Sequence, residues 1–304
     1  MKERFCQELE KYISAEHILK QEPMSAHTSF QTGGPAELFV SPTSEKEVQA
    51  ALSLAKEEEI PFFVMGNGSN LLVSDEGFRG MILQIGKNMQ QITVEDTELH
   101  VQAGALLSRI AKAALEHGLT GFEFAGGIPG SLGGAVAMNA GAYGGEMKDV
   151  LTEVTVLTPE GEICTLRAEE MDLSYRHSCV FDRQYVVLSA RIRLQQGDRE
   201  QIKARMDVLS QARREKQPLE YPSAGSTFKR PEGYFAGKLI QDTGLKGYTV
   251  GGAQVSEKHS GFVINRGGAE SCEILFLIRQ VQKKVQKKFG VFLETEVRLI
   301  GFEE

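Results

Sequence analysis

The sequence contains few cysteines and no metal-binding pattern of common spacing. Its four cysteines, Cys6, Cys164, Cys179 and Cys272, are scattered and form no CxxC pair, and its six histidines include no HExxH. Disulfide-stapled domains and zinc sites rely on clustered ligands. The pattern therefore indicates a reducing compartment, no disulfide framework and no resident metal.

Basic residues are also fewer than acidic ones. The 304 residues hold 34 Lys and Arg against 41 Asp and Glu, a net charge of −7. A mildly acidic chain lacks the overall positive charge that favours binding to nucleic acid or anionic lipid. A local basic pocket for a phosphate ligand is still compatible with this charge. Hydrophobic residues at 41% and charged residues at 25% are ordinary for a globular protein, which argues against disorder.

Long apolar runs are missing as well. Residues 1–20 are charged and lack the apolar centre of a signal peptide. The long uncharged stretch 124–145 contains eight glycines and Pro129, which makes it a poor membrane helix. We therefore expect a cytoplasmic protein that binds neither membranes nor nucleic acid.

Helices and strands are predicted in mixed order, which indicates an α+β fold. Helices are expected from Ser44 onward and over 105–117, 199–216 and 272–289, with helix and then loop over 1–25. Strands are expected at 60–65, 71–74, 81–85, 99–103, 150–158, 162–166, 186–194 and 291–300, the pair around Pro159-Glu160-Gly161 forming a hairpin. Strict alternation of strand and helix is absent, which argues against a doubly wound sheet. A shift in composition predicts a domain boundary near residue 197.

Glycine is the compositional outlier, with nine of its 32 residues between 121 and 145. In this segment almost every side chain is small, so the backbone can approach a flat ligand or a pyrophosphate closely. A flexible linker would lack its apolar residues Ile128, Leu132, Val136 and Met138. The shorter segment Gly66-Asn67-Gly68-Ser69-Asn70 can also turn backbone N–H groups toward an anion. Taken alone, either segment could instead be a structural turn.

Familiar nucleotide motifs are absent. Leu71 stands where a GxGxxG pattern needs glycine, and residues 233–238 fall one residue short of a P-loop and lack its Ser or Thr. A dinucleotide would therefore bind through another architecture.

Three polar segments are further candidates for a site. In Ser174-Tyr175-Arg176-His177-Ser178 the guanidinium could grip a carboxylate through two parallel hydrogen bonds, or form a surface ion pair. The loop 223–231 sets hydroxyls beside Lys229 and Arg230, or is an ordinary loop. In the last strand, alternation puts Leu293, Thr295, Val297 and Leu299 on one face and Glu294, Glu296 and Arg298 on the other, which could be a solvated face. His27, His177 and His259 are isolated.

Taken in order, these segments resemble one enzyme family. The motifs are TSFQTGGPA at 28–36, GNGSN at 66–70, AGGIPGSLGGAVAMNAGAYGGE at 125–146, SYRHS at 174–178, AGSTFKRP at 224–231 and LETEVRLIG at 293–301. They resemble the UDP-N-acetylenolpyruvoylglucosamine reductases, also called UDP-N-acetylmuramate dehydrogenases, of peptidoglycan precursor synthesis. The likeness spans about residues 25–301, and the short spacing from Arg176 to Ser226 is similar to the type II branch.

The resemblance implies an FAD-binding module of the vanillyl-alcohol-oxidase or PCMH type, built from two α+β subdomains at about 30–65 and 66–196. An N-terminal helical extension over 1–29 would precede it, and a C-terminal α+β substrate-binding domain over 197–304 would follow. The implied FAD-binding residues are Gly66, Asn67, Gly68, Ser69, Asn70, Gly126, Gly127, Pro129, Gly130, Ser131, Gly133, Gly134, Ala137, Asn139 and Gly141.

The resemblance also implies an activity, in which NADPH reduces FAD and hydride passes from flavin N5 to the vinyl carbon of UDP-N-acetylglucosamine enolpyruvate. Arg176 would stabilise the carboxylate and the charge that develops beside it. Ser226 would donate the proton to carbon, and Glu296 would orient the substrate or join the charge network. Tyr175, Lys229 and Arg230 would contact the substrate. Apart from the resemblance, the sequence contains no amphipathic coiled-coil stripe, so the protein is expected to be a monomer.

One departure and two alternatives accompany this prediction. His177 stands where many relatives have aspartate, which affects only local hydrogen bonding. A flavin oxidase of the same fold would need a histidine or cysteine placed to attach flavin, and none stands out in the glycine-rich loops. A non-catalytic flavin or nucleotide-sugar binder need not keep Arg176, Ser226 and Glu296 together.

Overall fold

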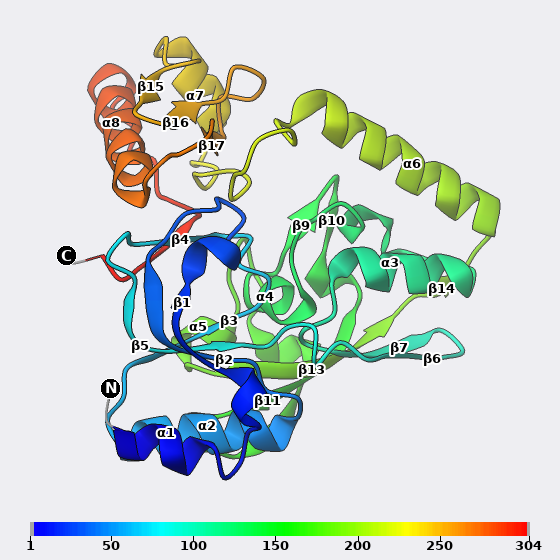
Figure 1. The fold of residues 1–304 in the computed structure, drawn as a ribbon. Helices are drawn as coiled ribbons and strands as arrows, with labels where there is room; N and C mark the ends of the chain where they lie inside the picture. Colours follow the sequence, from blue (N-terminus) through cyan, green and yellow to red (C-terminus); the bar gives the residue numbers. More distant parts are fainter. Residues whose placement is uncertain (1–2, 303–304) are drawn as a thin grey trace. The chain divides into compact units, whose positions relative to one another are not determined.

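The computed structural model describes residues 3–302, which form two compact units (Figure 1). The first unit is made of residues up to 20, 38–67 and 80–213, and the second of residues 21–37, 68–79 and 214 onward. The chain passes between the units five times, so neither unit is a continuous segment.

The framework of the first unit is one sheet and most of a second one. The larger is an antiparallel sheet in the order β12-β11-β13-β7-β6, made of β6 (Ile92–Glu95), β7 (Glu98–Gln102), β11 (Leu151–Leu157), β12 (Ile163–Arg167) and β13 (Val186–Arg193). The other has the order β1-β2-β5-β3, made of β1 (Ile18–Pro23), β2 (Pro35–Val40), β3 (Phe62–Met65) and β5 (Phe78–Gln84). Short pairs join β8 (Leu119–Thr120) to β14 (Gln195–Gln196) and β9 (Gly141–Ala142) to β10 (Gly145–Glu146).

Helices complete the first unit. They are α1 (Glu3–Leu9), α2 (Glu45–Glu57), α3 (Leu107–Glu116), α4 (Leu132–Ala137), α5 (Cys179–Asp182), α6 (Arg199–Lys216) and the 3₁₀ helices η1 (Ala15–His17), η3 (Glu123–Ala125), η4 (Met147–Asp149) and η5 (Ala168–Met171). The start of α2 shows why the sequence folds locally: the Ser44 hydroxyl accepts a hydrogen bond from the Glu47 N–H at 3.3 Å. The predicted stripe Val48, Leu52 and Ala55 is buried in the core.

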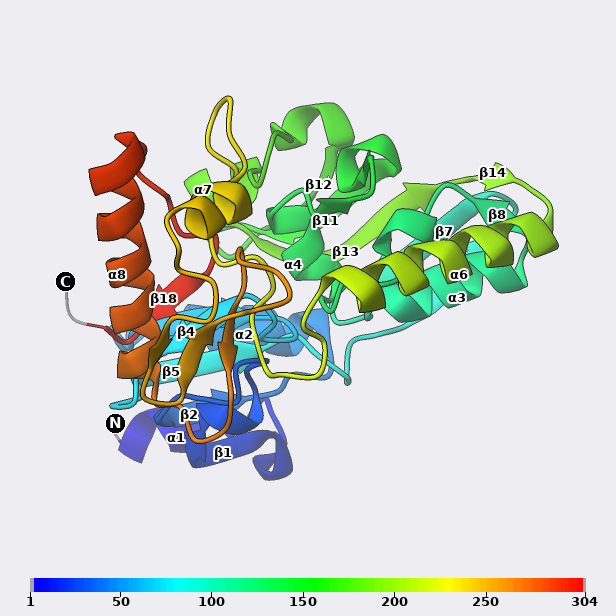
Figure 2. The ribbon, with the colours of Figure 1, turned by 90° about the horizontal axis from the view of Figure 1, so that it is seen from above.

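The second unit is built around one long helix. An antiparallel sheet of β15 (Thr249–Val250), β16 (Ala253–Val255) and β17 (Val263–Asn265) packs on α8 (Ser271–Phe289), and Figure 2 shows α7 (Ala236–Asp242) beside α8. β18 (Arg298–Ile300) pairs in parallel with β4 (Leu71–Val73), and η2 (Met24–Ala26) completes the unit. Phe30 and Leu72, from early segments of the chain, are fully buried in the same core.

The predicted helices over 105–117, 199–216 and 272–289 are confirmed by α3, α6 and α8. The predicted hairpin is confirmed by the antiparallel pairing of β11 with β12. No helix within residues 3–302 combines the length and the apolar character needed to cross a bilayer.

The prediction of helix and then loop over 1–25 is wrong for residues 18–23. These residues form strand β1, and only the helical part is confirmed, by α1. Ile18 is buried but the rest of the strand is largely exposed, so the segment has no alternation of apolar and polar residues to reveal it. It lies at the edge of its sheet, where β2 is its neighbour.

The closing strand is shorter than predicted. Only β18 forms a ladder, while Thr295 makes an isolated bridge to Phe228. The alternation also breaks, because Leu299 is 39% exposed and Ile300 is buried. β18 pairs with β4 alone, so a second neighbouring strand does not enforce a regular ladder over the whole segment.

Candidate cofactor and substrate site

Gly66 and Ser131 face each other in the first unit. A Cβ at Gly66 would lie 2.2 Å from the Ser131 Oγ, so a larger residue there would have to displace this hydroxyl. The Ser131 hydroxyl is buried and has no hydrogen-bond partner within residues 3–302. A buried unpaired hydroxyl costs about 1–3 kcal/mol, so a ligand that offers it a partner is favoured. The pair therefore fits a group that the main chain approaches closely, as the implied FAD would require.

The glycine-rich segment is an ordered frame. Asn67 Nδ2 donates to the Pro129 carbonyl at 2.8 Å, which fastens the shorter glycine segment to the longer one. Leu132 and Val136 of α4 are fully buried, and a Cβ at Gly133 would lie 3.1 Å from that of Ala103. Of the other predicted flavin-binding residues, Gly68, Ser69 and Asn70 belong to the second unit. Those of the glycine-rich segment belong to the first unit and are Gly126, Gly127, Gly130, Gly134, Ala137, Asn139 and Gly141. Their contacts with flavin stay a prediction.

Arg176 lies at the tip of a tight turn in the first unit. Ser174 N donates to His177 O at 3.1 Å, and His177 N donates to Ser174 O at 3.2 Å. Arg176 has a φ of 56°, in the left-handed region that costs a non-glycine residue on the order of 1 kcal/mol. Its guanidinium carbon lies 5.1 Å from the centre of the Tyr175 ring, and that ring is 52% exposed.

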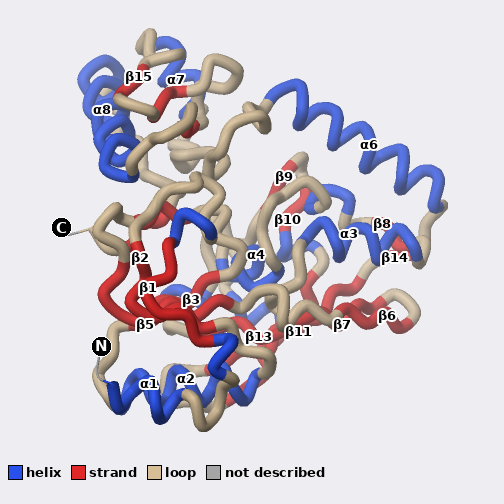
Figure 3. The backbone as a smooth tube through the Cα atoms, viewed as in Figure 1, coloured by secondary structure: helices blue, strands red, loops and turns tan. Residues whose placement is uncertain are grey.

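The segments that carry Ser226 and Glu296 pair through their backbones in the second unit. Glu296 N donates to the carbonyl of Thr227 at 2.9 Å, and Lys229 N donates to Glu294 O at 2.9 Å. The loop that carries Ser226 therefore runs antiparallel to the closing segment; Figure 3 shows it as part of the long coil between α6 and α7. Asn70 holds the same segment, since its Nδ2 donates to Glu296 O at 3.0 Å and its carbonyl accepts from Arg298 N at 3.0 Å.

The predicted substrate contacts of this loop differ in their surroundings. Lys229 Nζ lies 3.2 Å from Glu294 Oε2, in a partly exposed ion pair. The Arg230 guanidinium carbon stacks 4.0 Å from the centre of the Phe235 ring, which is 62% exposed. The convergence of this loop with Arg176, which belongs to the other unit, stays a prediction.

Arg213 is a candidate that sequence reasoning did not select, whereas Arg298 belongs to the predicted polar face of the last strand. A Cβ at Gly127 would lie 3.1 Å from Cδ and Nη1 of Arg213, so this α6 side chain covers the glycine-rich segment. Burial lowers the pKa of Arg213, with nearby Tyr143 acting in the opposite direction, and burial lowers the pKa of Arg298. A desolvated guanidinium favours an anionic partner. Arg213 is one of several cations on a charged helix, so no pattern in the sequence singles it out.

Family models match both halves of the chain. One, described as UDP-N-acetylenolpyruvoylglucosamine reductase, C-terminal domain, matches residues 217–300, and one described as FAD binding domain matches residues 36–167. A UDP-N-acetylenolpyruvoylglucosamine reductase of Caldanaerobacter subterraneus subsp. tengcongensis is 51% identical over 301 residues, covering 99% of each chain. The enzyme of the same name from Clostridium novyi is 53% identical over 295 residues, covering 97% of this chain and 96% of the relative.

Solved structures show the same fold. The crystal structure of UDP-N-acetylenolpyruvylglucosamine reductase from Thermus caldophilus matches with a TM-score of 0.80 and 35% identity, covering 93% of this chain and 98% of that one. A glucose dehydrogenase, wild-type Phl p 4.0202, matches with a TM-score of 0.53 and 14% identity over 65% of this chain and 45% of its own. The second likeness concerns the fold alone.

Proposed function

Because the chain belongs to the family of UDP-N-acetylenolpyruvoylglucosamine reductases, we propose that it reduces UDP-N-acetylglucosamine enolpyruvate to UDP-N-acetylmuramate. The observation that carries the proposal is 51% identity to an enzyme of that name over 99% of both chains. The protein is an FAD-dependent oxidoreductase with an α+β FAD-binding module of the vanillyl-alcohol-oxidase type, and NADPH is the reductant. The reaction belongs to peptidoglycan precursor synthesis.

The cradle at Gly66 and Ser131 would hold FAD, which when bound supplies the hydride that it receives from NADPH. Asn67 would keep the two glycine segments at a fixed distance through its bond to Pro129. Arg213 covers Gly127 in the same unit and would offer a desolvated cation to an anionic group of the cofactor or the substrate.

Arg176 would bind the substrate carboxylate and stabilise the negative charge that builds up beside it. A preorganised guanidinium achieves this without reorganisation during the reaction. The tight turn from Ser174 to His177 supports this role, since it fixes the backbone that carries the side chain.

Ser226 would give its hydroxyl proton to the substrate carbon next to the carboxylate, while Glu296 orients the substrate or joins the charge network. A hydroxyl is a weak acid, so it can act only if it is held close to a strongly basic carbon. The pairing of residues 227–229, which directly follow Ser226, with 294–296 supports a shared role for the two side chains. Tyr175, Lys229 and Arg230 would contact the remaining substrate, the cations chiefly its diphosphate.

A cytoplasmic, monomeric enzyme is proposed as well. Its cysteines are free thiols, which suits a reducing compartment, and its substrates are nucleotides.

An anaerobic visible absorption spectrum tests the function. We expect the yellow band of bound FAD to disappear after one equivalent of NADPH and to return after UDP-N-acetylglucosamine enolpyruvate is added. Denaturation should release unattached FAD. A protein that binds no flavin would contradict the proposal, and a band that returns only with oxygen would indicate an oxidase.

A further inference from the structure

The turn that carries Arg176 is fastened at both ends to the glycine-rich segment of the same unit. On one side, Asn139 Nδ2 donates to the Ser174 carbonyl at 3.0 Å. On the other, the Ser178 hydroxyl donates to the Ala137 carbonyl at 2.7 Å. Asn139 and Ser178 are 1% and 0% exposed, so water cannot replace either hydrogen bond. The two bonds hold a left-handed arginine that local sequence does not favour.

The Asn139 side chain has no N–H group left to donate to a cofactor. Its Nδ2 also donates to Glu146 Oε2 at 2.7 Å, and its Oδ1 accepts from Lys148 N at 2.9 Å. Both N–H groups and the amide oxygen are thus engaged within the protein. Its φ of 42° also lies in the left-handed region, which asparagine tolerates better than most residues. Both side chain and backbone therefore suit a linking role.

We infer that Asn139 and Ser178 are positioning residues, whose hydrogen bonds fix where Arg176 lies relative to the flavin-binding segment. Through Arg176 they affect the reaction with the substrate and not the reduction of the flavin. The inference rests on the proposed function, because it concerns the arginine assigned to the substrate carboxylate. It also replaces the predicted role of the Asn139 side chain as an FAD contact. Small displacements of a positioned group lower the rate strongly, so the effect falls on the half-reaction that uses Arg176.

The test separates the two half-reactions of the holoenzyme by stopped-flow spectroscopy. Asn139→Asp keeps the size and the backbone preference but removes both N–H donors, and Ser178→Ala removes the other link independently. We expect FAD content and flavin reduction by NADPH to stay within about twofold of the parent, while flavin reoxidation by the enolpyruvyl substrate slows roughly 10- to 100-fold. Asn88→Asp is the matched control, because Asn88 Nδ2 donates to the Ser41 carbonyl at 3.0 Å in the same unit. It should change neither half-reaction.

Two further measurements show whether the residues act through Arg176. In an Arg176→Ala background, adding Asn139→Asp or Ser178→Ala should slow reoxidation by less than about twofold, since the positioned group is gone. Calorimetry with UDP-N-acetylmuramate and the oxidised holoenzyme should show affinity reduced several-fold in both single variants, as in Arg176→Ala.

Three results would overturn the inference. The first is loss of FAD from either variant, and the second is equal slowing of both half-reactions. The third is that Asn139→Asp or Ser178→Ala slows reoxidation as strongly in the Arg176→Ala background as in the parent. If Asn139→Asp does not fold, Ser178→Ala carries the same expectations. A parent protein whose flavin is not reoxidised by the substrate would instead refute the proposed function, and this inference with it.

Discussion

Ser226 is exposed on a loop whose neighbours are held by main-chain bonds. Thr227 is fully buried and Phe228 nearly so, and the Thr227 hydroxyl accepts a hydrogen bond from Val263 N at 3.0 Å. The loop is thus anchored directly beside a hydroxyl that stays accessible. Such an arrangement suits a group that must reach a substrate without moving.

Replacing Ser226 with alanine should block one half-reaction. We expect flavin reduction by NADPH to be unchanged and flavin reoxidation by the enolpyruvyl substrate to slow about 10²- to 10⁴-fold, the usual contribution of a general acid. Single-turnover spectroscopy measures both rates. Ser223→Ala in the same loop is the control, and normal substrate reduction by the Ser226 variant would remove this hydroxyl from the chemistry.

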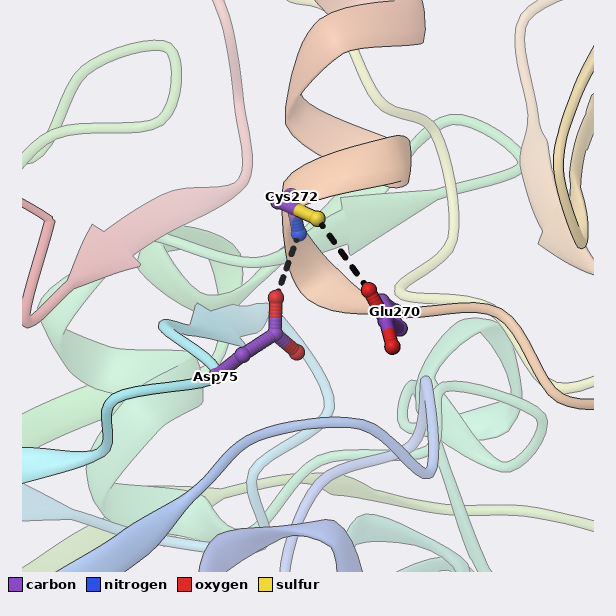
Figure 4. Close-up of side chains that lie close together, drawn as sticks. All are labelled: Asp75, Glu270 and Cys272. Carbon is purple, nitrogen blue, oxygen red and sulfur yellow. Dashed lines mark hydrogen bonds between the residues drawn. The ribbon is translucent and has the colours of Figure 1, made fainter.

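At the scale of elements, the start of α8 depends on a residue almost 200 positions earlier. Ser271 N donates to Asp75 Oδ1 at 2.7 Å. Cys272 N donates to Asp75 Oδ2 at 2.8 Å (Figure 4). Asp75 follows β4, so one carboxylate links the helix to the strand pair of the second unit. Burial, with Asp75 and Glu270 nearby, also raises the pKa of the Cys272 thiol.

Removing this carboxylate should destabilise the second unit. Asp75→Ala leaves two N–H groups of α8 without their acceptor, and we expect a loss of about 1–2 kcal/mol in the free energy of unfolding. Urea unfolding monitored by circular dichroism measures it. Glu76→Ala, in the same loop, should cost less than about 0.5 kcal/mol. Equal losses in the two variants would show that the cap does not contribute.

His259, in the loop between β16 and β17, makes stability depend on pH. Burial lowers its pKa, and its Nδ1 lies 3.1 Å from Gly261 N, which donates to the neutral ring. The unfolded chain takes up a proton near pH 6.5, while the folded ring resists it until lower pH. The stabilising effect is therefore complete above pH 6.5 and is lost as the pH falls toward the folded pKa.

Urea unfolding at pH 7.5 and 5.5 tests this dependence. The parent should lose about 0.5 kcal/mol more than His259→Gln over this interval, a small difference because the ring is only half-buried. His100→Gln, on the exposed face of β7, should behave like the parent. An identical loss in all three proteins would exclude His259 as the cause.

The sequence predicts well those elements that have a clear periodicity of apolar residues or a clear helix-capping residue. The helix of Val48, Leu52 and Ala55 begins where Ser44 indicates it, because both signals are local. β1 is missed because it is a largely exposed edge strand without alternation of apolar and polar residues. The irregular segment before β18 is missed because its partner, Phe228, lies far along the chain. α4 within the glycine-rich segment also carries no helical signal, because glycine disfavours helices and tertiary packing overrides that preference.

At the scale of the molecule, the candidate site can be predicted only as an ordered set of motifs. Arg176, Ser226 and Glu296 are isolated polar residues until the order of six motifs links them to a family. Arg213 is missed because only the fold places it against Gly127. The links from Asn139 to Ser174 and from Ser178 to Ala137 are invisible in sequence for the same reason.

The second unit is not a segment that can be cut from the end of the chain. Its core includes Phe30 and Leu72 from residues 21–37 and 68–79, and its helix α8 is capped by Asp75. Asn265 Nδ2 also donates to the Phe30 carbonyl at 3.0 Å, with both residues buried. The C-terminal domain predicted over 197–304 stays a prediction, and a fragment with only these residues would lack the contacts to Phe30, Leu72 and Asp75.

We therefore expect residues 197–304, produced alone, not to fold. Loss of the buried Phe30 side chain is comparable to a large-to-small core substitution, which costs about 3–5 kcal/mol. The missing strand partner and helix cap add to this cost. The total approaches the whole free energy of unfolding of a small domain. Proton–nitrogen NMR spectra should show narrow amide dispersion, and urea should produce no cooperative transition. The full chain, in which all three segments are present, is the control. A dispersed spectrum and a sharp transition from the fragment would show that the early segments are dispensable for this core.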